Sequence, residues 1–103
     1  MTGKPNAQEL LEQLFDAERR AREVEATLLA SVRGEELERS IGKAVERALE
    51  LNDSAEQAAR LTRLSDLCAQ VQGSKMADAL ILILNHEDPQ VRVAAGEALR
   101  DFA

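Results

Sequence analysis

Tryptophan and tyrosine are absent from this 103-residue chain, and phenylalanine occurs only at Phe15 and Phe102. Proteins that hold single-stranded nucleic acid stack its bases on aromatic side chains, so the composition argues against that activity. The formal net charge of −6 also opposes binding to a polyanion, because Lys and Arg provide most of the non-specific affinity for phosphates. We therefore expect no nucleic-acid partner.

Cysteine occurs once, at Cys68, so no disulfide can form within the chain. The segment from Met1 to Glu9 has no apolar stretch of the kind that a secretory signal requires, and both observations favour a reducing, cytoplasmic location. The longest apolar run, 79–84, is far shorter than the roughly 20 residues of a membrane-spanning helix. The sequence therefore predicts a protein that does not enter the membrane.

Glycine-rich loops are also missing, since the five glycines stand singly in the sequence. No glycine-rich phosphate-binding loop is therefore present. Cys68 lies on an apolar stripe with no His or Lys beside it, which favours a small packed side chain over a nucleophile. We expect no catalytic residue, no cofactor and no metal, and hence no enzyme activity.

What the chain does contain is 45% apolar residues arranged at helical spacing. A first helix is predicted from Asn6, which stands at capping-box distance from Glu9, to about Val32. Gly34 follows at a position where a left-handed residue can close this helix. The apolar stripe of the helix is expected to be buried and consists of Leu10, Leu14, Ala17, Ala21, Val24 and Leu28, with Leu11 and Phe15 alongside.

Two further amphipathic helices are predicted, with stripes over 37–51 and 58–71. Asp53 and Glu56 repeat the capping-box spacing at the start of the third helix, and Gly73 is expected to close it.

The fourth helix is predicted to begin at Ser74 as its cap and to include 79–84, which could instead form a buried strand. Helix is favoured because no second β-rich segment exists to pair with a strand. For the fifth helix, Asp88 is the expected N-cap and Pro89 the first helical residue, where a missing N–H is harmless.

The end of the chain combines an apolar helix, a short polar turn that ends in Asp88 and Pro89, Val91 and Arg92 just inside the next helix, and then several alanines. This combination resembles a HEAT repeat of the armadillo-like class, most clearly over 76–103. The resemblance implies that Asp88, Pro89, Val91 and Arg92 are architectural. It also implies that the arginine bonds to acidic or carbonyl groups of a turn.

We expect an all-α fold: a five-helix antiparallel array that ends in a HEAT-type helical hairpin, as in a fragment of an α-solenoid. After a disordered tail over 1–5, a single helical domain spans 6–103. Within it, 6–32 is a capping helix and 74–103 is the HEAT-like repeat, while 34–72 is either a degenerate earlier repeat or unrelated cover. The repeat with its apolar Phe102 is not followed by a polar capping element, which favours the N-terminal part of a longer repeat protein.

The resemblance implies a non-enzymatic scaffold that binds another protein. The predicted contact surface is the concave side that the second helices of the hairpins form, represented in the last helix by Gln90, Val93, Glu97 and Arg100. HEAT-like hydroxylases hold iron with His-Glu pairs, but His86 and Glu87 form the only such pair here, so a solvated turn is favoured. The alternative function is homodimerisation, with helix 6–32 as a coiled-coil-like interface.

Overall fold

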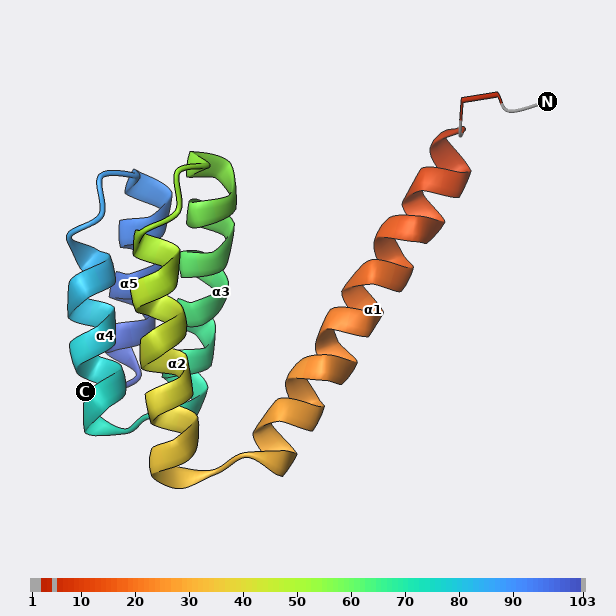
Figure 1. Ribbon diagram of the computed structural model, residues 1–103. Helices are drawn as coiled ribbons and strands as arrows, with labels where there is room; N and C mark the ends of the chain where they lie inside the picture. Colours follow the sequence, from red (N-terminus) through yellow and green to blue (C-terminus); the bar gives the residue numbers. More distant parts are fainter. Residues whose placement is uncertain (1–2, 5, 103) are drawn as a thin grey trace. The chain divides into compact units, whose positions relative to one another are not determined.

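The computed structural model describes residues 3–4 and 6–102, and all regular structure in these ranges is α-helical. In Figure 1 the helices are α1 (Ala7–Ser31), α2 (Gly34–Leu49), α3 (Ser54–Val71), α4 (Ser74–Leu84) and α5 (Pro89–Arg100). The all-α class and the five predicted helices are confirmed over this part of the chain. The predicted disordered tail includes Met1, Thr2 and Pro5, which lie outside the described residues.

The chain divides into two compact units, Met1–Arg33 and Gly34–Ala103. The first unit contains α1, and the second contains α2 to α5. The two units differ in whether their apolar residues are buried.

The first and third helices begin at the N-caps that the sequence predicts. The side chain of Asn6 accepts a hydrogen bond from the Glu9 N–H at 2.8 Å, and that of Asp53 accepts from the Glu56 N–H at 3.1 Å. Each carboxamide or carboxylate oxygen thus satisfies one of the N–H groups that a helix start leaves without an intrahelical partner. Both capping-box predictions are confirmed for the N-cap bond.

Gly34 adopts the left-handed conformation that the sequence predicts, with φ +64°. Its place in the fold is different, because α1 already ends at Ser31 and the extended Val32 donates its N–H to the Leu28 carbonyl at 3.0 Å. Gly34 is instead the first residue of α2. A residue with a Cβ would be strained there, so the glycine serves the entry into α2.

The junction of α3 and α4 corrects two predictions. Gln72, and not Gly73, is the left-handed residue that ends α3, with φ +57°, and its N–H donates to the Cys68 carbonyl at 2.9 Å. Gly73 is extended and is itself the N-cap of α4, so Ser74 is the first helical residue and not the cap. Because Gln72 already ends α3, the single residue Gly73 lies between the two helices and takes the N-cap position without a capping side chain. Residues 79–84 lie in α4, so the alternative strand is wrong.

The core of the second unit is built without aromatic side chains. Helices α2 and α3 form one contacting pair and α4 and α5 another, and α2 also contacts α4 while α3 contacts α4 and α5. Figure 1 shows these four helices packed side by side. Their buried apolar residues are Leu37, Ile41, Val45, Ala48, Leu61, Leu64, Leu67, Cys68, Met76, Ala79, Leu80, Ile83, Val91, Ala95 and Ala98. The alanines let neighbouring helices approach closely.

The first unit has no such core, because none of the 25 residues of α1 is buried. Leu10 and Leu14 are each 50% exposed, Phe15 is 54% exposed and Val24 is 51% exposed. The prediction that the apolar stripe of this helix is buried is therefore wrong for the single chain. The physical reason is that its unit contains no second helix against which the stripe could pack.

Candidate protein-binding site

The turn between α4 and α5 carries the residues that resemble a HEAT repeat. Asp88 caps α5 by accepting from the Gln90 N–H at 2.9 Å, and Pro89 is the first helical residue, as predicted. The Nη1 of Arg92 donates to the carbonyls of His86 and Glu87 at 3.0 and 2.8 Å. Arg92 thereby ties the first turn of α5 to the loop before it, a contact of the kind that the resemblance implies.

His86 is half-buried in this turn, whose neighbouring residues Asn85 and Glu87 are exposed. Its Nδ1 accepts from the Asp88 N–H at 3.0 Å, so the ring proton lies on Nε2, which donates to Gln57 Oε1 at 2.8 Å. Gln57 Nε2 in turn donates to the carbonyls of Ala48 and Leu49, each at 3.1 Å. This network joins the α4–α5 turn to the end of α2 and gives His86 a structural role.

The thiol of Cys68 is fully buried, and burial raises its pKa from 9.0 to about 11. A thiol with such a pKa is almost entirely protonated near neutral pH and is a poor nucleophile. Within the described part of the chain, no three His, Cys, Asp or Glu side chains are grouped so that they could hold a metal ion.

The four positions predicted to contact a partner lie on one exposed face of α5. Gln90, Val93, Glu97 and Arg100 are all exposed, and Val93 is 58% exposed. Their spacing of three, four and three residues places them on one side of the helix, away from its buried face. The structure brings them together, and their binding role stays a prediction.

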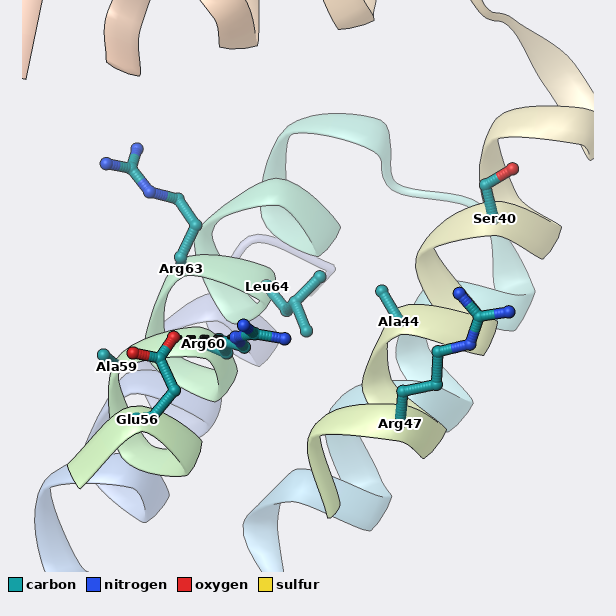
Figure 2. Close-up of a pocket in the computed structure, with 8 residues that line it drawn as sticks. All are labelled: Ser40, Ala44, Arg47, Glu56, Ala59, Arg60, Arg63 and Leu64. Atoms are coloured by element: carbon teal, nitrogen blue, oxygen red, sulfur yellow. Dashed lines mark hydrogen bonds and ion pairs between the residues drawn. The ribbon is translucent and has the colours of Figure 1, made fainter. Parts of the chain in front are cut away.

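A second surface lies between α2 and α3, and the sequence analysis missed it. We call it the arginine groove, and it has a volume of about 480 Å³. Figure 2 shows the side chains that line it: Ser40, Ala44, Arg47, Glu56, Ala59, Arg60, Arg63 and Leu64. Ala44 of α2 leaves the space beside Leu64 of α3 unfilled, and Leu64 provides an apolar floor (Figure 2). In the sequence, the pattern that indicates this groove is a set of alanines beside arginines at helical spacing.

The lining of the arginine groove is basic although the whole chain carries a net charge of −6. Arg47 comes from α2, while Arg60 and Arg63 come from α3, and Figure 2 shows Arg60 extending toward the gap between the two helices. Glu56 is the one acidic residue of the lining, and it pairs with Arg60 at 2.7 Å. The groove thus combines an apolar floor with positively charged walls.

Comparison with known proteins gives the chain no relatives: no family model, no curated protein and no solved structure matches it. Over the described ranges, no helix has both the length and the apolar character needed to cross a membrane.

Proposed function

We propose that this chain is a non-enzymatic protein-interaction module of the HEAT-repeat type. The contacts within the second unit support this proposal, because two consecutive hairpins, α2–α3 and α4–α5, pack first helix on first helix and second on second. Stacked helical repeats bury their cores in this manner. The proposal includes 34–72 as a degenerate repeat, since its two helices form the hairpin on which α4–α5 packs.

The turn chemistry supports the same proposal. Asp88 and Pro89 set the start of α5, and Arg92 holds the carbonyls of the turn. The two side chains of catalytic type have structural roles instead. His86 bonds through both ring nitrogens, and the Cys68 thiol is buried in the core. The unpaired Cys68 is also compatible with a reducing cytoplasmic location, which we include in the proposal.

The observation that carries the binding role is the arginine groove. Its apolar floor and basic walls suit an amphipathic helix whose apolar side chains enter the groove and whose carboxylates meet Arg47 and Arg60. Arginine binds carboxylates with two parallel hydrogen bonds, which adds orientation to the attraction. The groove volume lies within the range of roughly 300–1,000 Å³ that is typical of binding pockets. The proposed partner is therefore an acidic helical segment of another protein.

Site-specific photo-cross-linking in the source cells tests the proposal. A photoreactive residue at Ala59 should cross-link to a partner protein, whereas one at Val93, on the α5 face, should not. The Arg47→Glu substitution should abolish the Ala59 cross-link. Arg39→Glu, on the same helix but outside the groove lining, should not affect it.

The alternative results are distinct. A cross-link that forms from Val93 and not from Ala59 would move the binding surface to the α5 face. An Ala59 cross-link that survives Arg47→Glu would refute the acidic partner. The absence of a cross-link from both positions would contradict the interaction module itself.

A further inference from the structure

The apolar stripe of α1 follows the heptad spacing of a coiled coil. Its residues recur at alternating steps of four and three: Leu10, Leu14, Ala17, Ala21, Val24 and Leu28. Leu14, Ala21 and Leu28 then occupy a positions, and Leu10, Ala17 and Val24 occupy d positions. The stripe runs along a helix of 25 residues, or about 37 Å at the usual rise per residue.

Every residue of this stripe is at least partly accessible to water in the single chain. An exposed apolar surface of this length on a soluble helix marks an association site. A second copy of the chain presents the same stripe at the same spacing, so the surface is complementary to itself. The alanines at 17 and 21 permit a close approach of two such helices.

The charges beside the stripe determine the direction of pairing. Glu18 and Glu25 occupy e positions, and Arg20 occupies a g position. In a parallel, in-register pair each g residue faces the e residue five positions further along the other helix, so Arg20 faces Glu25 twice by symmetry. In an antiparallel pair e faces e and g faces g, which sets the glutamates against each other.

Arg20 is available for this contact. Its Nη1 lies 4.0 Å from Glu23 on the same helix, at the limit of an ion pair, and the side chain is 77% exposed. A turn of the Arg20 guanidinium toward Glu25 of another copy therefore gives up little of its present ion pair with Glu23.

We infer that α1 joins two copies of this chain in a parallel, in-register coiled coil. This association is independent of the arginine groove, and it goes beyond the proposed function because it specifies a second partner. Since α2 follows α1 directly, both four-helix units leave the coiled coil at the same end. Two arginine grooves in one particle would give a bivalent binder, whose affinity for a paired target exceeds that of a single groove.

Light scattering on the full chain tests the association. The expected mass is twice the 11.3 kDa of one chain. The double variant Leu14→Glu and Val24→Glu should be monomeric while Cys68 stays protected from labelling, which shows that the second unit remains folded. The matched control, Ala26→Glu and Ala30→Glu, places the same charges on exposed outward positions and should remain dimeric. A monomeric wild-type chain at about 100 μM would overturn the inference.

Charge exchange tests the direction. Arg20→Glu should raise the dimer dissociation constant at least about tenfold, and adding Glu25→Arg should restore it. Arg22→Glu makes the same charge change away from the seam and should have little effect. If Arg20→Glu behaves like Arg22→Glu, the parallel pairing is wrong.

Disulfide trapping provides a second measurement of direction. Chains with Ala7→Cys should form a disulfide with each other, and so should chains with Ser31→Cys, because both positions lie on the seam. A mixture of the two should give no crossed product in a parallel pair, whereas crossed product alone would indicate an antiparallel pair. The wild-type chain is the control, because its one cysteine is buried.

Discussion

Helices α1 and α2 carry similar apolar stripes but differ completely in burial. In α2, Leu37, Ile41 and Val45 are 5%, 3% and 1% exposed, whereas Leu10 and Leu14 of α1 are each 50% exposed. Both stripes follow the spacing that predicts an amphipathic helix. The comparison shows that helical spacing identifies the apolar face of a helix but does not identify what covers it.

The stability of the two helices should therefore come from different sources. Isolated helices are only marginally stable in water, and most helical stability in proteins comes from packing of the apolar face. For α2 that packing is present within the chain, against α3 and α4. For α1 we propose that it comes from a second copy.

The largest difference is expected for truncation of an apolar side chain. Leu61→Ala removes a fully buried side chain and should lower the free energy of unfolding of the second unit by roughly 2–5 kcal/mol. Leu14→Ala should change it by less than about 0.5 kcal/mol, because Leu14 lies in the other unit. Labelling of the Cys68 thiol as a function of urea measures this unit alone. An equal loss from Leu14→Ala would mean that α1 belongs to the same cooperative fold.

Thiol reactivity should separate the two regions by about two orders of magnitude. Burial raises the Cys68 pKa from 9.0 to about 11, so the thiolate fraction near neutral pH falls about 100-fold. A cysteine placed at the exposed Ala26 of α1 should react with an alkylating reagent at least that much faster. Comparable rates would show that Cys68 is not protected.

The raised pKa of Cys68 also fixes the sign of a pH effect. The folded chain holds the thiol proton more tightly than the unfolded chain, so its contribution to stability is complete below pH 9. That contribution should decline as the pH rises from 9 to about 11. Cys68→Ala should remove this part of the pH dependence in urea unfolding curves, and an unchanged curve would contradict it.

A smaller difference is expected for glutamine. Gln57→Ala removes the donor to the carbonyls of Ala48 and Leu49 and the acceptor for His86, and it should destabilise the second unit by roughly 1–3 kcal/mol. Gln8→Ala, on the exposed surface of α1, should change the same free energy by less than about 0.5 kcal/mol. Urea unfolding followed by Cys68 labelling compares the two. Equal losses of unfolding free energy from the two substitutions would show that this hydrogen-bond network does not join the two hairpins.

The sequence predicted most of what is local. Asn6, Asp53 and Asp88 were identified as N-caps because a helix start needs an acceptor for an N–H two or three residues ahead. Capping depends on neighbouring residues only, so spacing was sufficient. The sequence predicts that Gly73 closes α3 because glycine adopts positive φ most easily, but Gln72 takes that conformation.

What the sequence did not predict depends on contacts between distant residues. The partners of His86 include Gln57, which lies 29 residues away in the sequence. The arginine groove requires Ala44 and Arg47 on one helix to lie beside Arg60 and Leu64 on another (Figure 2), which no local pattern specifies. The exposure of α1 also depends on distant residues, because periodicity does not show whether a partner for the apolar stripe lies within the chain.

The smallest difference is expected at the helix caps, where the two regions have similar hydrogen bonds. Asn6→Ala and Asp53→Ala each remove one acceptor, from Glu9 and Glu56 respectively. Loss of the Asp53 cap should lower the free energy of unfolding of the second unit by about 1 kcal/mol, because α3 packs against α2, α4 and α5. Loss of the Asn6 cap should instead fray the first turn of α1, which amide hydrogen exchange over 7–10 would detect, and should leave Cys68 labelling unchanged. If Asn6→Ala also exposes Cys68, a local cap in α1 influences the second unit, and the two units do not unfold independently.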